Sequence, residues 1–109
     1  MLTEDHTASK AYDAPGLIGL AMRGRLLTLG EDGCLKAIRS GTASLIIIDE
    51  GASPGTLKKF QDASAYHNVK LVMLKAGQLG RTIGKPGRKV TVVQDKKLAD
   101  GILRAMGAT

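Results

Sequence analysis

The stretch SLIIIDEGASPG, residues 44–55, decides the fold class of this 109-residue chain. Its first half, Ser44 to Asp49, is a continuous apolar and mostly β-branched run, which is typical of a strand covered on both faces of a sheet. Its second half contains Ser53 and Pro54, a side-chain N-cap and a proline suited to the first turn of a helix. A buried strand that leads directly into a helix favours an α/β architecture.

Helices and strands alternate on both sides of this stretch. Apolar residues recur with a helical period in residues 15–23, 31–40 and 54–66. Short apolar runs typical of strands occupy residues 25–30, 70–75 and 89–93. Residues 78–84 indicate a short helix or turn, and Asp95 is the expected N-cap of a last helix that runs through Met106. The sequence therefore predicts a three-layer α/β/α sandwich around a central, mixed, four-stranded sheet.

Length and composition predict one domain with a tail. Hydrophobic residues make up 43% of the chain and charged residues 24%, which is ordinary for a folded protein of this size. Residues 1–14 are small and polar and show no apolar period. We expect a flexible N-terminal tail over residues 1–14 and a single domain over residues 15–109.

Composition also bears on the compartment and on cofactors. The longest apolar run, Leu45 to Ile48, is far too short to span a membrane, and the acidic start lacks the regions of a secretory signal. A cytoplasmic location without a membrane partner is expected. The single cysteine, Cys34, and two distant histidines predict neither a disulfide nor a metal site, and we expect no cofactor.

The charge of the chain favours a polyanionic partner. The formal net charge is +6, and the residues after position 14 include 15 basic and 7 acidic side chains. Six of these basic residues lie between Arg81 and Lys97. Such a cluster is what binding to nucleic acid requires, because each neutralised phosphate releases counterions. A solvated surface that aids solubility is the alternative interpretation.

Two segments are candidate binding sites. In α/β folds, ligands gather where strand ends meet helix N-termini, which indicates residues 29–36 and 75–85. These segments carry the motifs GEDGCLKAIRSG and, after the third expected strand, LG followed by IGK. With LIIIDE before the Ser-Pro helix start, these motifs make the chain resemble the RNA-binding ribosomal protein superfamily of the archaeal L-seven-Ae and L-thirty-e proteins. The resemblance runs from about Pro15 to Leu103.

The resemblance implies a small bacterial-type protein that binds kink-turn RNA, a sharply bent element with tandem sheared G·A pairs. The expected partner is structured RNA, either ribosomal or another folded non-coding RNA. In the family, an Asn-Glu pair and a lysine at the start of the second helix enter the RNA groove. Asp32, Gly33 and Lys36 occupy those places here, so Lys36 keeps the family residue. The expected RNA-binding residues are Gly30, Glu31, Asp32, Gly33, Lys36, Arg39, Lys75, Leu79, Gly80, Arg81 and Lys85.

Some of these positions have a second, purely structural interpretation. Glu31 and Asp32 are also typical helix-start acids that stabilise free amides and the helix dipole. Leu79 either packs on an extruded base, as the resemblance implies, or packs inward. Gly80 would allow the backbone to approach the ribose-phosphate chain closely, or would serve a tight turn within the protein.

Two other classes of function remain as alternatives. A protein-interaction module that has lost kink-turn specificity would show no salt-sensitive binding of RNA. A receiver-like domain would accept phosphate on Asp49, but Asp49 follows Asp32 by only 17 positions, which is too few for the receiver topology. No serine-histidine-acid or cysteine-histidine set is evident, so we expect no catalytic residues and no enzyme.

Overall fold

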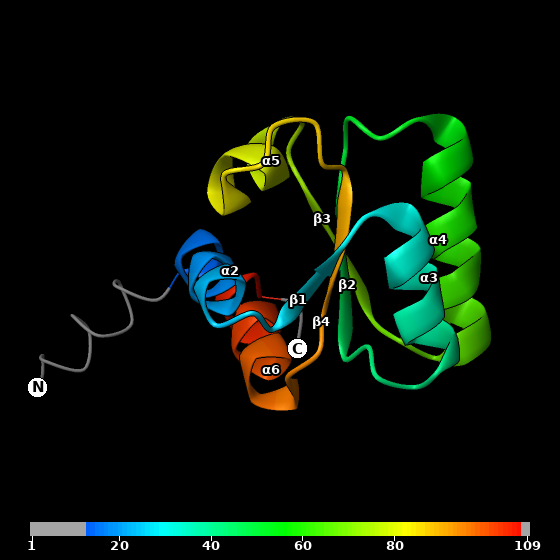
Figure 1. The fold of residues 1–109 in the computed structure, drawn as a ribbon, viewed down its shortest axis with the longest axis horizontal. Coiled ribbons are helices and arrows are strands. Elements are labelled where there is room, and N and C mark those ends of the chain that lie inside the picture. The colour runs from blue at the N-terminus through cyan, green and yellow to red at the C-terminus, as the bar shows by residue number, and fades with distance from the viewer. Residues whose placement is uncertain (1–12, 108–109) are drawn as a thin grey trace, which may run out of the picture.

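The computed structural model describes residues 13–107 and confirms the alternating order of helices and strands (Figure 1). The elements are α2 (Ala14–Arg23), β1 (Leu27–Leu29), α3 (Glu31–Arg39), β2 (Leu45–Asp49), α4 (Pro54–His67), β3 (Leu71–Leu74), α5 (Gln78–Ile83), β4 (Val90–Val93) and α6 (Lys96–Ala105). Within this range, no helix is long and apolar enough to cross a membrane.

The four strands form one mixed sheet in the order β1-β4-β2-β3. Strand β4 pairs antiparallel with both β1 and β2, whereas β2 and β3 are parallel. Helices α3 and α4 cover one face of the sheet, and α2, α5 and α6 cover the other (Figure 1). The predicted three-layer α/β/α sandwich with a mixed sheet is therefore confirmed.

The strand directions bring several connections to one edge of the sheet. Because β1 and β2 are both antiparallel to β4, and β3 is parallel to β2, the three strands β1, β2 and β3 end at the same edge. We call it the carboxyl edge. The starts of α3, α4 and α5 lie there, together with the segment 84–89 that leads into β4. The chain leaves β4 at the opposite edge, where α6 begins.

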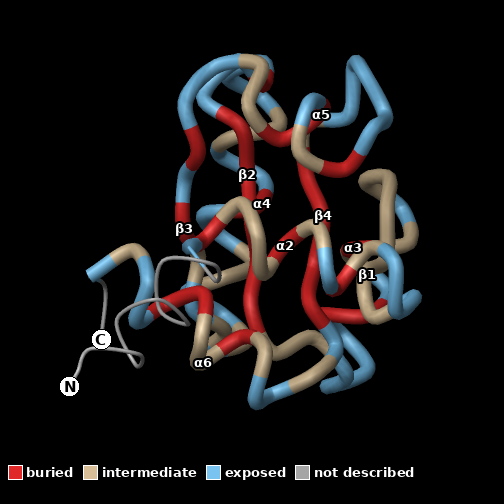
Figure 2. The backbone as a smooth tube through the Cα atoms, turned by 90° about the vertical axis from the view of Figure 1, so that its left-hand side faces the viewer, coloured by how far each residue is buried: buried red, intermediate tan, exposed pale blue. Residues whose placement is uncertain are grey.

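Strand β2 supplies the centre of the core, as its sequence predicts. All five of its residues are buried (Figure 2). The side chains of its first four residues alternate between the two faces. Leu45 and Ile47 pack in the cluster under α2, α5 and α6, whereas Ile46 and Ile48 pack with Phe60 in the cluster under α3 and α4. This two-sided burial explains why β2 shows no polar alternation in sequence.

The helix boundaries differ slightly from the predicted ones, for local reasons. Helix α2 begins at Ala14, because the Asp13 side chain caps it by accepting a hydrogen bond from the Gly16 amide at 2.8 Å. The last two residues of the expected tail thus belong to the entry of α2, and residues 1–12 lie outside the described residues. Helix α4 extends to His67, and Asn68 ends it in the left-handed conformation with φ of 56°.

Candidate nucleic-acid interface

The N-terminus of α3 and the segment before β4 meet at the carboxyl edge and enclose a small hollow. Gly30 is the N-cap of α3 with φ of +87°, and a Cβ atom there would lie 3.0 Å from an Arg88 guanidinium nitrogen. The hollow has a volume of about 230 Å³. It is lined by Gly30, Glu31, Gly87, Arg88, Lys89 and Val90. Backbone amides of a helix start and two cations thus face one concave surface, which suits an anion.

Glu31 lies at this edge but is engaged within the protein. Its carboxylate accepts hydrogen bonds from Lys59 Nζ and Thr56 Oγ1, each at 3.0 Å. The hydrogen bond from Lys59, followed by the one from Thr56, lowers the pKa of the Glu31 carboxyl below its ordinary value. Glu31 therefore connects the start of α3 to the first turns of α4.

Asp32 and the cap of α3 behave differently from Glu31. The Asp32 side chain is exposed, and within residues 13–107 it makes no side-chain hydrogen bond or ion pair. The N-cap, Gly30, provides no side-chain hydrogen bond either. Two acids in the first turn still interact favourably with the helix dipole. The carboxylate of Asp32 is thus oriented by its place at the helix start and is open to a partner.

Asp49, at the end of β2, organises the neighbouring loops. Its side chain is fully buried, and its Oδ1 accepts hydrogen bonds from the amides of Gly51 (2.7 Å) and Gly77 (3.0 Å), while Oδ2 accepts from Leu79 (3.1 Å). Burial alone would raise the pKa of this carboxyl, but the three amide donors, together with the charge of Lys89, hold the pKa below its ordinary value. The carboxylate fixes the start of α5 against the sheet.

This geometry is incompatible with the receiver-like alternative. A phosphate-accepting carboxylate must be reachable by its phosphodonor and by a metal ion. Both oxygens of Asp49 instead accept backbone hydrogen bonds in the interior. In the part of the chain that the structure describes, no group of three His, Cys, Asp or Glu side chains is arranged to hold a metal ion.

For two residues of the second loop, the structure supports the purely structural interpretation. Leu79 is fully buried in the core, so its side chain packs inward and is not presented to a base. Gly80 is also buried: a Cβ atom there would lie 3.1 Å from the Lys85 carbonyl oxygen and 3.2 Å from Pro86 Cα. The missing side chain of Gly80 therefore allows the protein's own segment 85–87 to approach α5, instead of an RNA backbone.

Replacing Gly80 with alanine is expected to destabilise the protein by about 2 kcal/mol, because a methyl group at this position meets backbone atoms that cannot rotate away. Thermal unfolding followed by circular dichroism measures the effect. Gly55→Ala in α4 is the matched control, because it is also helical and the nearest atom to its new methyl group is 4.0 Å away. A Gly80 variant as stable as the wild type would contradict the close approach.

The exposed cations of the second loop lie at the carboxyl edge. Lys75, Arg81, Lys85 and Arg88 are exposed, and Lys89 is half-buried beside Asp49. Lys96 and Lys97 belong to the same basic run in sequence, but β4 carries the chain to the opposite edge before α6 begins. The structure thus divides the run into two groups. We call Lys75, Arg81, Lys85, Arg88 and Lys89 the basic edge.

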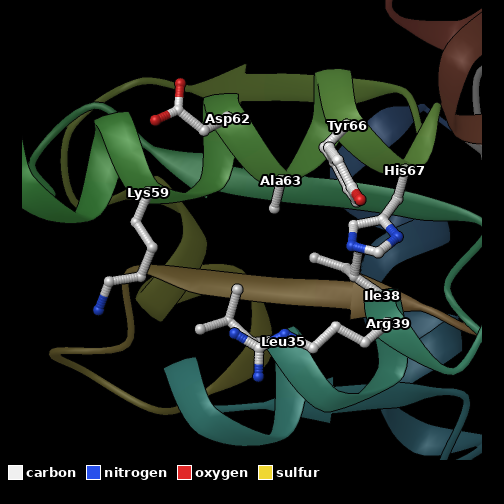
Figure 3. Close-up of a pocket in the computed structure, with 8 residues that line it drawn as sticks. All are labelled: Leu35, Ile38, Arg39, Lys59, Asp62, Ala63, Tyr66 and His67. Carbon is white, nitrogen blue, oxygen red and sulfur yellow. The ribbon is translucent and has the colours of Figure 1, made fainter.

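The structure separates two cations of α3 that the sequence analysis placed together. Lys36 is exposed on the side of α3 that faces β1, whereas Arg39 lines a groove of about 320 Å³ between α3 and α4 (Figure 3). The floor of this groove is apolar, and Tyr66, which is 85% exposed, stands at one end of it beside His67. Arg39 therefore contributes to a surface different from that of Lys36.

Cys34 is a core residue. Its side chain is fully buried under α3 and donates to the Thr28 carbonyl oxygen at 3.2 Å. Burial raises the pKa of the Cys34 thiol to about 12, so the thiolate that a nucleophile requires is not formed near neutral pH.

The sequence analysis missed Arg88 and Lys89 as site residues. The LG…IGK motif of the second loop ends at Lys85. The segment 84–89 then turns back, so that Arg88 lies over Gly30. The signal that would have found them is the direction of the last strand. Because β4 starts at the carboxyl edge, the residues immediately before it must lie beside the start of α3.

Fold and site together define a small α/β/α protein in which a helix N-terminus and a cluster of cations share one edge of a mixed sheet. The chain belongs to the ribosomal protein L7Ae/L30e/S12e/Gadd45 family, whose model matches residues 13–101. This match confirms the resemblance seen in the sequence.

Relatives and solved structures agree with this membership. The RNA-binding protein YlxQ of Bacillus subtilis (strain 168) is 39% identical over 88 residues, which cover 80% of this chain and 88% of the relative. YlxQ of Enterococcus faecium is 38% identical over 87 residues, which cover 79% and 84%. The structure of a protein of unknown function from Bacillus halodurans C is similar with a TM-score of 0.83 and 30% identity, covering 88% of this chain and 98% of that one.

A more distant structure shares the fold. The Giardia lamblia 15.5kD RNA binding protein superposes with a TM-score of 0.71 at 19% identity, covering 98% of this chain and 89% of that one. At this level of identity the likeness concerns the arrangement of helices and strands alone.

Proposed function

We propose that the protein is a non-enzymatic RNA-binding protein that recognises structured, kink-turn-like RNA in the cytoplasm. The observation that carries the proposal is the junction of the α3 N-terminus with the basic edge, where Arg88 lies over Gly30. Exposed cations beside free helix amides are the features that bind a phosphate backbone. The family membership and the two relatives named as RNA-binding proteins support the same function.

The roles of the residues follow from their positions. The cations of the basic edge and Lys36 contact phosphates, which supplies affinity and positions the RNA. Asp32, exposed in the first turn of α3, accepts a hydrogen bond from a base edge such as the amino group of guanine. Leu79, Gly80 and Glu31 act indirectly, since they hold the loops that carry the contacts. Ribosomal RNA and other folded non-coding RNAs are the candidate ligands.

Replacing Lys36 with alanine is expected to weaken binding to a kink-turn RNA about tenfold, because an exposed phosphate contact is lost without any change in the core. Fluorescence anisotropy with the purified protein, at salt concentrations of about 0.05 M and 0.2 M, measures the effect. The matched control is Lys58→Ala, which removes an exposed lysine of α4 that pairs with Asp62 of the same helix and is not among the proposed contacts.

The same assay includes a kink-turn RNA whose G·A pairs are replaced by Watson–Crick pairs. Preference for the intact kink, reduced by Lys36→Ala and unaffected by Lys58→Ala, is the expected result. Equal, salt-sensitive binding to both RNAs would contradict kink-turn specificity while leaving an electrostatic RNA surface. Absence of binding to either RNA would overturn the proposed function and favour a protein partner.

A further inference from the structure

The groove between α3 and α4 presents apolar side chains on the outer surface of the helical layer. Leu35 and Ile38 of α3 and Ala63 of α4 lie along the space between the two helices and form its floor (Figure 3). Arg39 and Tyr66 stand at its rim. We call this surface the α3–α4 groove. It shares no lining residue with the hollow at the basic edge.

We propose that the α3–α4 groove docks a short segment of another protein, in which a large apolar side chain lies on the floor and a neighbouring carboxylate pairs with Arg39. The proposal goes beyond the proposed function, because it assigns a protein partner to a surface that the proposed RNA contacts do not use.

Tyr66 is the most exposed large side chain of the groove. Its residue is 85% exposed, and its ring packs edge-to-face against His67, with ring centroids 4.9 Å apart and 76° between the planes. This contact limits the positions of the ring before a partner arrives, which lowers the entropy cost of binding. Tyrosine and arginine are among the residues that dominate the binding energy of protein interfaces, and Tyr66 and Arg39 line the same groove.

The charges around the groove favour an acidic partner. Asp62 pairs with Lys58 at 3.0 Å, and Lys59 pairs with Glu31 at 3.0 Å, so both of these lining residues already have a partner of opposite charge. Arg39 forms no ion pair among residues 13–107. A guanidinium binds a carboxylate through two parallel hydrogen bonds. The rim is therefore complementary to an aspartate or glutamate beside the inserted apolar side chain.

The volume of the groove favours a short segment. At about 320 Å³, it lies near the lower limit of sites for small ligands, about 300–1,000 Å³. A large apolar side chain and the backbone that carries it are a suitable occupant. Because the groove and the hollow at the basic edge have separate linings, the protein segment and an RNA can bind at the same time.

The chain itself matches this chemistry poorly as a partner. Apart from Tyr66, the large exposed hydrophobic side chains of the described residues are Leu20 of α2 and Met73 of β3. Neither α2 nor β3 contains an acidic residue. Residues 1–12 lead into α2, which covers the opposite face of the sheet (Figure 1). A different protein is therefore favoured over a second copy or the N-terminus of the same chain.

The test titrates short synthetic peptides into the isotope-labelled protein and follows the backbone amide signals by NMR. Each peptide carries one leucine or phenylalanine and one glutamate, spaced by about one to four residues, in an otherwise neutral and polar sequence. The peptide that binds most tightly is compared with two matched peptides, in which alanine replaces the apolar residue or lysine replaces the glutamate. The expected result is a set of shift changes concentrated at Leu35, Ile38, Ala63 and Tyr66, which the alanine peptide does not produce.

Substitutions on the protein identify the contacts. Arg39→Glu is expected to bind the glutamate peptide at least about tenfold more weakly than the wild type does, and to bind the lysine peptide more tightly. Tyr66→Ala is expected to weaken binding of the glutamate peptide about tenfold. The matched control is Arg104→Glu, which reverses the charge of an exposed arginine in the last turn of α6 and should keep the wild-type affinity. Melting temperatures equal to the wild type verify that the variants are folded.

Several outcomes would overturn the proposal. Absence of binding by every peptide is one, and equal weakening by Arg39→Glu and Arg104→Glu is another, because it would indicate an effect of net charge alone. A peptide of residues 1–12, which contain Leu2, Glu4 and Asp5, is also titrated. Binding of this peptide alone would make the N-terminus of the chain the occupant.

Two further measurements distinguish the remaining occupants. A monomer–dimer equilibrium in analytical ultracentrifugation that Tyr66→Ala abolishes would make a second copy the occupant and overturn the proposal. Kink-turn RNA that shifts the same groove signals, and that binds Arg39→Glu more weakly than the wild type, would make RNA the occupant and also overturn it. The RNA assay with Lys36→Ala tests the proposed function independently, so either proposal can fail while the other stands.

Discussion

Replacing Asp49 with alanine is expected to lower the free energy of unfolding by about 3–5 kcal/mol. The carboxylate is fully buried and accepts hydrogen bonds from three backbone amides, which alanine would leave without their acceptor. Urea denaturation at neutral pH, followed by far-ultraviolet circular dichroism, measures the difference. Glu50→Ala is the matched control, because this neighbouring acid is exposed.

The contribution of Asp49 has a defined pH dependence. Its pKa in the folded protein lies below its ordinary value, so its ionised form stabilises the fold. This stabilisation is fully present above the pKa of an unfolded aspartate, about 3.9, and is lost as the pH falls through the lower folded pKa. The gap between wild type and Asp49→Ala should therefore narrow below about pH 4. Equal unfolding midpoints at neutral pH would show that the three hydrogen bonds carry little stability.

The second large effect concerns the basic edge. A triple variant, Arg81→Gln, Lys85→Gln and Arg88→Gln, is expected to lose at least about a hundredfold in affinity for RNA near 0.1 M salt. In a plot of the logarithm of the binding constant against the logarithm of the salt concentration, the slope should also become less negative by about 2 to 3. The reason is that three phosphate contacts, and the counterions that they release, are lost. The three side chains are exposed, so the fold should persist.

A control variant separates local contacts from total charge. The control is a second triple variant that removes an equal number of charges from the opposite edge of the sheet. Its substitutions, at the starts of β3 and α6, are Lys70→Gln, Lys96→Gln and Lys97→Gln. This control is expected to bind with nearly the affinity of the wild type and with a similar salt slope. If both triple variants lost affinity equally, net charge would explain the binding, and the basic edge would have no special role.

The fold was predictable because local and long-range signals agree. The run from Leu45 to Ile48 requires cover on two faces, and the Ser53-Pro54 pair starts a helix directly after it. Both features appear where the sequence places them. The ends of elements follow from local geometry that periodicity does not reveal: α4 continues to His67, one residue beyond its apolar pattern, and Asn68 in the left-handed conformation ends it.

The details of the site depend on residues that meet across the sheet. The sequence marks Asp49 as a polar strand end, but not that its acceptors are used by amides 28 and 30 residues later. Gly80 suggests a close backbone approach, but not that the approaching chain is the protein's own segment 85–87. Motif matching marks where a loop lies, whereas burial decides which of its side chains can reach a partner.

The hydrogen bonds of Asp49 also influence the order in which the molecule folds. Helix α5 has six residues, too few to be stable alone, and its first turn is held by a carboxylate about 30 residues earlier in the chain. We therefore expect the carboxyl edge to be completed after β2 and β3 have paired, and to be among the first parts to open in a partial unfolding. A ligand that requires this edge intact would shift the equilibrium toward the native state by mass action. Binding at this edge would thus be thermodynamically linked to folding through one buried acid.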